Sequence, residues 1–378
     1  MIGLYGEFVM FHNTYNGSQQ VDFPRHSIVT IVQVTLITVF ISCQRQHVPA
    51  RVIAIPEAWE TTLGAKTTFD EIFEKVAETP LQTPDSIIIG QVGDALTEDR
   101  NGNIYIIDMT EKSVVVFDST GKYVRHVGKK GSGPTDFRLI RGVYYNDVDD
   151  RLYVCDPKLK RVSVFDRNST LVSTINVPNQ YTWKIYVDSL KNLYLFEPSP
   201  YAEFMFAVYN QMGIQTRSFG QKLPEKFKAF GNAIGGDYAH YPGGFIYVDI
   251  FLPRVFNYSE SGEELTDFPI VNPLYRPVPM EFAPDSHPRR YTPVIGAFVI
   301  KDRLIITQLM VFQEREQSRA LLDLYDFTGK QLKAAVPAEF PFYYCCRHNE
   351  LFTFRYVKAG SDNKLRNPYM IKYKVRGL

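Results

Sequence analysis

The sequence has few cysteines and tryptophans and almost no net charge. Of its 378 residues, four are cysteine and two are tryptophan, and the formal net charge is +1. Four cysteines without regular spacing form neither a disulfide framework nor a Cys-x-x-Cys metal motif, and the adjacent Cys345 and Cys346 would point to opposite faces of a strand. A nearly neutral chain has no electrostatic footprint for nucleic acid, which is therefore not an expected partner.

Local signatures of catalysis are missing as well. The chain has neither the Gly-x-Ser-x-Gly elbow of serine hydrolases nor the His-Glu-x-x-His pattern of zinc proteases. The glycine-rich segment 128–133 leads into a predicted strand, whereas a phosphate loop must open onto a helix N-terminus, so we interpret it as a connection between repeats. The recurring Asp108, Asp156 and Asp249 are predicted to cap turns. No cofactor is expected.

No apolar run is long enough to span a bilayer comfortably. The run at residues 28–41 has about the length of a signal-peptide core and follows Arg25 and His26. The sequence Phe40-Ile41-Ser42-Cys43 resembles the lipobox of bacterial lipoproteins, in which the cysteine is acylated and becomes the mature N-terminus. This resemblance predicts a signal segment at 1–43, lipidation at Cys43 and a tether at 44–68. The alternatives are a signal without a lipid and an ordinary buried strand.

A repeat of about 40 to 50 residues runs through the rest of the chain. Its first landmark is a short apolar strand after a turn. Clear copies lie at 103–108, 151–156 and 192–197, and weaker copies at 244–249, 303–307 and 350–354.

The second landmark is an aromatic residue that ends a strand, with a turn residue four positions later. The aromatics are Phe117, Phe165, Tyr209, Tyr258, Tyr325 and Tyr373, and the turn residues are Gly121, Ser169, Gly213, Gly262, Gly329 and Gly377. Successive aromatics are 44 to 49 residues apart, except for one interval of 67. A period of this length is typical of propellers, because a small twisted sheet buries both faces only with a neighbour on each side.

Both landmarks give six units, so the sequence predicts an all-β fold: a six-bladed β-propeller over 69–378 with four-stranded antiparallel blades. The sixth unit ends soon after Tyr373 and lacks an outer strand. The extended segment 73–81 precedes the first unit and is predicted to supply that strand, which would close the ring without an open edge.

The segment 94–137 resembles an NHL repeat, through Asp99-Arg100-Asn101-Gly102-Asn103-Ile104-Tyr105, Val116-Phe117-Asp118 and Gly128–Phe137. Together with the lipobox, the chain from about residue 68 resembles the six-bladed propeller lipoproteins of the bacterial envelope, whose molecular function is mostly unassigned. The resemblance implies a lipid-anchored protein on the periplasmic side or the cell surface. It transfers no catalytic residues.

Candidate ligand contacts lie on or beside the predicted inner strands. Arg141 directly precedes the inner strand 142–145 and is expected to point into the channel; the alternative is a structural ion pair or a hydrogen bond to loop carbonyls. Lys184, Tyr238, His240 and Arg347 are the other candidates.

Two further regions are candidates for binding. Cations gather in or near the first two units and could form a patch for an anionic glycan or a phospholipid headgroup, or could simply be solvated. They are Lys129, Lys130, Arg138, Arg141, Lys158, Lys160 and Arg161. The long interval between Tyr258 and Tyr325 contains an insertion, which is either a binding loop or a connection without a role.

The leading hypothesis is a monomeric, non-enzymatic binding or scaffold module for a protein, peptide or glycan partner. The alternative is a metal-dependent hydrolase or lyase of the lactonase-like propeller type. For that alternative, candidate metal ligands are Glu98, Asp147, Asp188 and His240, although nothing in their spacing requires a metal.

Overall fold

The computed structural model describes ten stretches of the chain. They are residues 69–178, 182–198, 203–220, 236–249, 253–272, 274–275, 293–312, 318–345, 348–356 and 366–376. The predicted signal segment, Cys43 and the tether lie outside the described residues.

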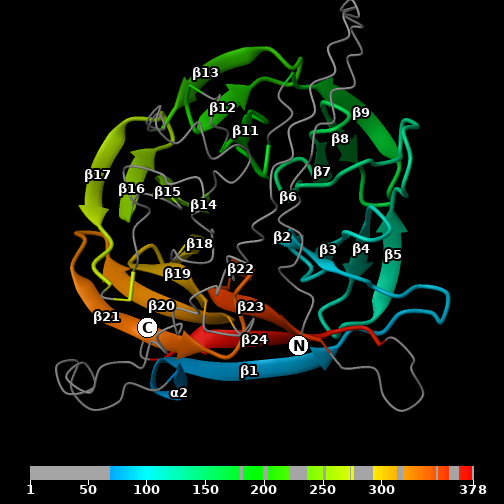
Figure 1. Ribbon diagram of the computed structural model, residues 1–378. Helices are drawn as coiled ribbons and strands as arrows, with labels where there is room; N and C mark the ends of the chain where they lie inside the picture. Colours follow the sequence, from blue (N-terminus) through cyan, green and yellow to red (C-terminus); the bar gives the residue numbers. More distant parts are fainter. Residues whose placement is uncertain are drawn as a thin grey trace, which may run out of the picture. The chain divides into compact units, whose positions relative to one another are not determined.

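The strands form six separate four-stranded antiparallel sheets arranged as the blades of a ring (Figure 1). Blade 1 consists of β2 (Val92–Glu98), β3 (Ile104–Asp108), β4 (Ser113–Phe117) and β5 (Tyr123–Val127). Blade 2 consists of β6 (Gly142–Asn146), β7 (Arg151–Asp156), β8 (Arg161–Phe165) and β9 (Leu171–Asn176). Blade 3 consists of β10 (Lys184–Val187), β11 (Leu193–Phe196), β12 (Phe206–Tyr209) and β13 (Gln215–Phe219).

The second half of the ring repeats this order. Blade 4 consists of β14 (Gly236–Tyr241), β15 (Gly244–Asp249), β16 (Arg254–Ser259) and β17 (Glu264–Pro269). Blade 5 consists of β18 (Val294–Ile300), β19 (Leu304–Phe312), β20 (Ser318–Asp326) and β21 (Gln331–Ala338). Blade 6 consists of β22 (Tyr344–Cys345), β23 (Glu350–Arg355), β24 (Tyr369–Val375) and β1 (Phe73–Pro80), which follows the short helix α2 (Phe69–Ile72). The predicted six-bladed, all-β architecture is confirmed.

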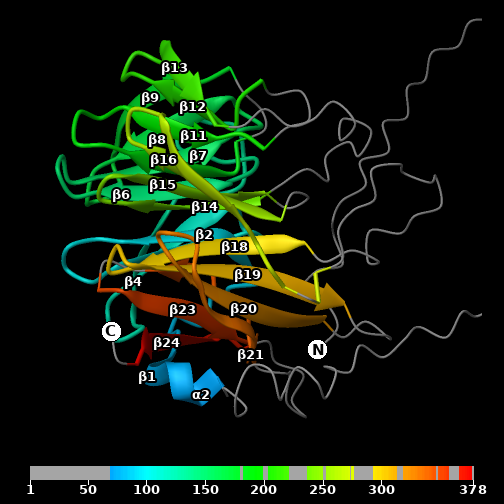
Figure 2. The ribbon, with the colours of Figure 1, turned by 90° about the vertical axis from the view of Figure 1, so that its left-hand side faces the viewer.

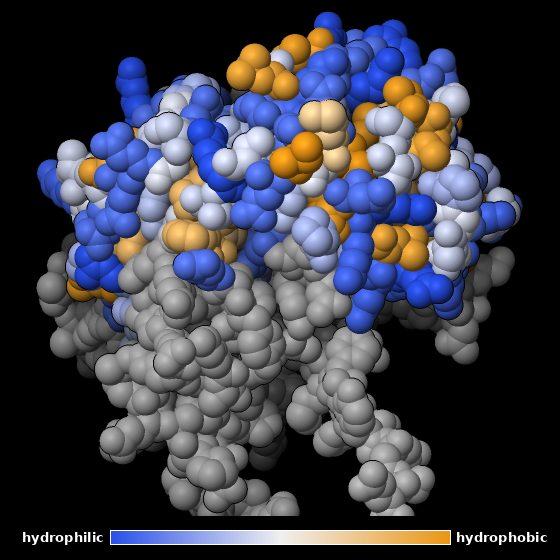
Figure 3. All heavy atoms as spheres, turned by 90° about the horizontal axis from the view of Figure 1, so that it is seen from above, coloured by the Kyte–Doolittle hydropathy of each residue, from blue (hydrophilic) through white to orange (hydrophobic). Residues whose placement is uncertain are grey.

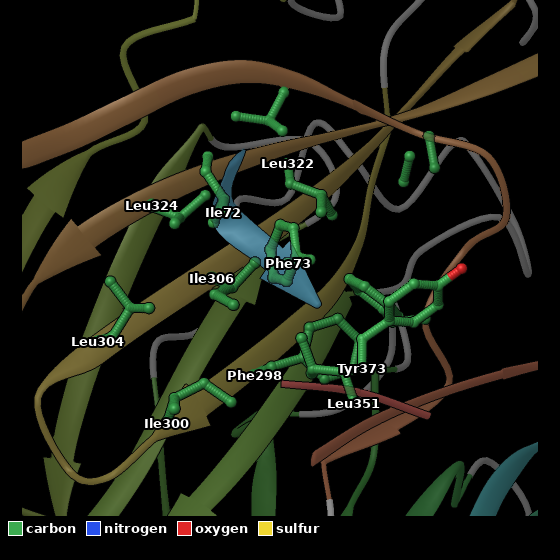
Figure 4. Close-up of a cluster of buried hydrophobic side chains, with 14 of the residues drawn as sticks. Ile72, Phe73, Phe298, Ile300, Leu304, Ile306, Leu322, Leu324, Leu351 and Tyr373 are labelled. Atoms are coloured by element: carbon green, nitrogen blue, oxygen red, sulfur yellow. The ribbon is translucent and has the colours of Figure 1, made fainter. Parts of the chain in front are cut away.

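Closure by the N-terminal strand is also confirmed. The strand β1 pairs antiparallel with β24, from Phe73 opposite Val375 to Pro80 opposite Tyr369. Figure 2 shows this strand and α2 beside β24 at the edge of the ring. Phe73 is buried together with Ile72 and Tyr373 among aliphatic side chains of blades 5 and 6 (Figure 4). The closing strand therefore contributes to the core as well as to the hydrogen-bond ladder.

The aromatic landmark of the repeat has a clear physical role. Each of the six aromatics lies in a different one of six buried clusters, and each cluster joins two neighbouring blades. Phe117 packs where blade 6 meets blade 1, and Tyr373 where blade 5 meets blade 6. The repeat is therefore visible in the sequence because every interface between blades needs one large side chain at the same place.

The turn landmark is explained by backbone conformation and space. Gly121, Gly213, Gly262 and Gly329 have φ between 76° and 87°, a region that glycine enters without strain. Each turn also approaches the preceding blade closely: a Cβ at Gly121 would lie 2.7 Å from the carbonyl oxygen of Pro80 in β1. Gly377 lies outside the described residues.

Candidate functional site

The candidate ligand contacts lie on neighbouring blades. The first strand of each sheet lines the centre of the ring and the fourth forms its rim (Figure 1). Arg141 directly precedes β6, Lys184 begins β10, and Tyr238 and His240 belong to β14. The structure thus places four of the five candidates on blades 2, 3 and 4, whereas Arg347 lies outside the described residues.

Arg141 directly precedes the inner strand β6 and lies beside a tryptophan. Its guanidinium carbon is 5.5 Å from the centre of the Trp183 ring, and its side chain is 34% exposed. Its ion pair with Asp94 is long, at 4.0 Å, and the Asp94 side chain is 79% exposed, so the pair contributes little to stability. Arg141 therefore makes a cation–π contact with Trp183 while its side chain stays partly accessible.

Trp183 and Asp94 complete this group, which we call the mouth triad (Asp94, Arg141 and Trp183). Trp183 has in the third unit the place of Arg141 in the second, directly before the inner strand, and is partly exposed. Asp94 lies at an irregularity of β2 between Val92 and Leu96, and such irregularities re-aim side chains. The sequence reasoning missed both, although aligning the repeats on their inner strands would have placed Trp183 beside Arg141.

Lys184 and Asp237 form a largely buried ion pair between blades 3 and 4, which we call the lock. The ammonium group of Lys184 pairs with the carboxylate of Asp237, which also accepts a hydrogen bond of 3.1 Å from the backbone N–H of Ala297 in blade 5. Burial raises the pKa of Asp237 above its usual range, and the charge of Lys184 opposes that shift. Lys184 therefore has a structural role that the sequence did not reveal, and its role as a ligand contact stays a prediction.

Tyr238 and His240 belong to an aromatic core rather than to an open wall. Tyr238 is 7% exposed and packs with its ring centre 5.3 Å from those of Phe196 and Phe206. His240 stacks on Tyr186 at 3.6 Å, and its Nε2 lies 3.6 Å from the Glu260 carboxylate. Burial lowers the pKa of His240 to about 4, so the imidazole is neutral at physiological pH.

A cavity of about 250 Å³ opens near the turns of blades 2 and 3. Two of the candidate metal ligands, Asp147 and Asp188, contribute to its lining. Both are engaged: Asp147 accepts a 3.0 Å hydrogen bond from the backbone N–H of Arg100, and both carboxylate oxygens of Asp188 accept hydrogen bonds within its turn. No group of three or more His, Cys, Asp or Glu side chains among the described residues could hold a metal ion.

The repeated acids Asp108 and Asp156 cap turns, as predicted. Asp108 accepts a hydrogen bond from the backbone N–H of Thr110, and Asp156 accepts one from that of Leu159. Asp249 accepts a 2.8 Å hydrogen bond from the Tyr247 hydroxyl, and its capping of a turn stays a prediction, because residues 250–252 lie outside the described residues. The segment 128–133 leads into β6, which confirms its interpretation as a connection between blades.

The described part of the outer rim has a second hollow. A groove of about 510 Å³ lies between blades 3 and 4, lined by residues that include Phe204, Arg254 and Asp267. Figure 3 shows the side of the ring that lies at the top of Figure 1, where hydrophobic residues form small groups between hydrophilic ones. Examples of exposed hydrophobic residues are Met212 and Ile214 beside β13, which are 76% and 56% exposed. Among the described residues, no helix is long and apolar enough to cross a membrane.

Comparisons with known proteins support the family and the fold. A family model described as a domain of unknown function, DUF4934, matches residues 50–273. A protein from Bacteroides fragilis whose name describes it as exported has a TM-score of 0.63 and 15% identity, covering 82% of this chain and 98% of its own. A member of the DUF4221 family from Bacteroides vulgatus has a TM-score of 0.59 and 11% identity, covering 81% of this chain and 99% of its own.

Other comparisons add little. A streptogramin B lyase aligns over 81% of this chain and 99% of its own, but its TM-score of 0.45 and 12% identity carry no conclusion about activity here. No curated protein matches the sequence.

Proposed function

The chain belongs to the DUF4934 family, and we propose that it is a lipid-anchored envelope β-propeller that binds a protein, peptide or glycan partner at its channel mouth without catalysing a reaction. The mouth triad carries this proposal. It combines a partly exposed indole, an accessible guanidinium and an exposed carboxylate on the inner edges of three blades.

The chemistry of the triad favours a glycan among these partners. An indole face stacks on the apolar face of a sugar ring, as it does on other apolar and cationic surfaces. Guanidinium and carboxylate groups supply fixed donors and acceptors that match adjacent hydroxyls. Because Arg141 already contacts Trp183 without a ligand, less side-chain entropy is lost on binding than for an unrestrained arginine.

The binding site can be tested by calorimetry with defined probes. We expect residues 44–378, which contain every described strand, to bind at least one oligosaccharide of a panel of malto-, xylo-, manno- and chito-oligomers. Arg141→Ala should weaken that binding about tenfold or more, because the lost hydrogen bonds are charge-assisted. Arg254→Ala is the matched control, since Arg254 is 39% exposed and lies on the rim in an ion pair with Asp267. Equal binding by Arg141→Ala and the parent would show that the mouth triad is not the binding site. A panel without any binding would exclude these glycans as ligands.

The proposed anchor rests on the apolar run 28–41 and the lipobox-like sequence before Cys43. The exported character stated in the name of the Bacteroides fragilis protein is consistent with it. Metabolic labelling with a radioactive fatty acid should mark the parent chain and not the Cys43→Ser variant. Equal labelling of the two chains would refute the anchor.

A further inference from the structure

Exposed cations gather where blade 1 leads into blade 2. We call Lys129, Lys130, Arg138, Lys158 and Lys160 the basic ledge; all five are exposed. Three belong to the connection 128–141 between β5 and β6, and two to the turn between β7 and β8. Contacts hold these segments together, since the Arg161 guanidinium donates hydrogen bonds of 2.7 Å to the carbonyl oxygens of Gly133 and Asp136.

The backbone under the ledge is fixed. Phe137 is completely buried, and its backbone N–H donates a 2.8 Å hydrogen bond to the carbonyl of Lys129. Gly128 has a φ of 72° and passes so close to Phe137 that a Cβ there would lie 2.2 Å from the ring. The lysine side chains therefore project to solvent from a rigid base, and their position does not depend on a ligand.

The ledge carries a charge excess that the whole chain does not. The segments 128–138 and 156–161 contain six cations, the five of the ledge and Arg161, and two carboxylates, Asp136 and Asp156. Both carboxylates accept backbone hydrogen bonds, Asp136 from Gly133 and Asp156 from Arg138 and Leu159. Four positive charges are thus in excess here, against a formal net charge of +1 for all 378 residues.

We infer that the basic ledge docks the propeller on a membrane surface of anionic phospholipid headgroups. Clusters of four to eight lysines and arginines bind such surfaces through summed electrostatic attraction, which needs no pocket. The ledge fits this description better than it fits a glycan site. Its one aromatic residue, Phe137, is completely buried and cannot stack on a sugar, and neither of the two hollows described above is lined by ledge residues.

The inference uses the proposed envelope location but not the channel site. The predicted tether 44–68 could span up to about 80 Å if fully extended, so an anchor at Cys43 would allow any face of the ring to reach the bilayer. A ledge that adds attraction to the anchor would select one orientation of the ring on the membrane. A polybasic patch is a known second signal for stable attachment of lipidated proteins.

Vesicle sedimentation tests the ledge in the absence of the anchor. Residues 44–378 should sediment with vesicles of phosphatidylglycerol and phosphatidylcholine but not with phosphatidylcholine alone, and the binding should fall steeply as salt is added. Replacing Lys129, Lys130, Lys158 and Lys160 together by Gln should weaken the binding at least about 100-fold, because each lysine contributes roughly fivefold. The matched control replaces Lys122, Lys301, Lys330 and Lys333, which are exposed elsewhere on the ring.

The arms of the experiment separate lipid from other anions. Inorganic phosphate at moderate concentration should not displace the protein from the vesicles beyond the effect of its ionic strength, and heparin should bind less tightly than the vesicles. Unchanged thermal midpoints would show that the variants are folded. Equal loss in the ledge and control variants, no binding by the parent, or preference for heparin over the vesicles would each overturn the inference. Failure of the glycan titration would leave it intact, because Arg141 and Trp183 are not part of the ledge.

Discussion

Two neighbouring interfaces between blades differ in the kind of side chain that fills them. Twelve buried residues form the described cluster between blades 2 and 3, and only Tyr153 and Tyr209 among them are aromatic. Twelve also form the cluster between blades 3 and 4, where ten are aromatic and only Met205 and Val208 are not. The same propeller geometry is therefore satisfied by two kinds of packing.

The difference follows from how closely the inner strands approach. At the first interface, Gly142 of β6 leaves no space for a side chain, since a Cβ there would lie 2.8 Å from Ile185 of β10. At the second, β10 and β14 are joined through long side chains, by the Lys184–Asp237 pair and the stack of His240 on Tyr186. Large rings and a polar lock take the place of close backbone packing, and this makes the second interface depend on charge and pH.

The largest expected effect comes from breaking the lock. Lys184→Met leaves the Asp237 carboxylate buried without its cation, which should lower the free energy of unfolding by about 3 kcal/mol or more. The matched variant at the other interface is Lys191→Met, because Lys191 pairs with Asp149 at 3.9 Å and is 40% exposed. We expect less than about 1 kcal/mol there. Urea unfolding of both variants would measure the difference. Similar losses in the free energy of unfolding would show that the Lys184–Asp237 pair contributes no more than an exposed ion pair.

Acid should weaken the aromatic interface. The pKa of His240 is lowered to about 4 in the folded chain from an ordinary value of 6.5, so the unfolded chain takes up the proton first as the pH falls. Stability from this group is complete above pH 6.5 and is lost between pH 6.5 and 4, by about 3 kcal/mol in all. His240→Phe keeps a ring against Tyr186 and should remove this part of the pH dependence in urea unfolding. An unchanged pH profile would contradict the assignment.

The smallest expected effect comes from glycine substitutions. Here the interface between blades 2 and 3 should lose more stability than the interface between blades 3 and 4. Gly213→Ala would place its Cβ 2.2 Å from the carbonyl oxygen of Asn176 in blade 2, whereas Gly262→Ala would meet the side chain of Phe219 in blade 3. Backbone yields less readily than a side chain, so we expect a loss of about 2 kcal/mol for Gly213→Ala and about 1 kcal/mol for Gly262→Ala. Thermal unfolding would rank them, and a larger loss at Gly262 would contradict the comparison.

The features that the sequence revealed are those that recur in every blade. The spacing of Phe117, Phe165 and their counterparts follows directly from one large side chain per interface, and the absent outer strand of the sixth unit led to β1. A repeat makes such features visible because the same physical need is met six times along the chain.

The candidate site was predicted less well, because its contacts occur once. Arg141 was expected to point into the channel because it precedes an inner strand, but its cation–π contact with Trp183 joins two blades and has no counterpart in the repeat. Lys184, Tyr238 and His240 were proposed as channel residues, and the structure gives them packing partners across blades 3 and 4. Pairing between residues some 50 positions apart depends on ring geometry, which local patterns do not contain.

In the proposed function, Trp183 forms part of an open site at the channel mouth. Trp59 and Trp183 are the two tryptophans, so the Trp59→Phe variant reports on Trp183 alone. We predict that acrylamide quenches the fluorescence of this variant readily, and that a glycan found to bind in the calorimetric panel protects it. Fluorescence that acrylamide does not reach, or quenching that the bound glycan leaves unchanged, would contradict the account.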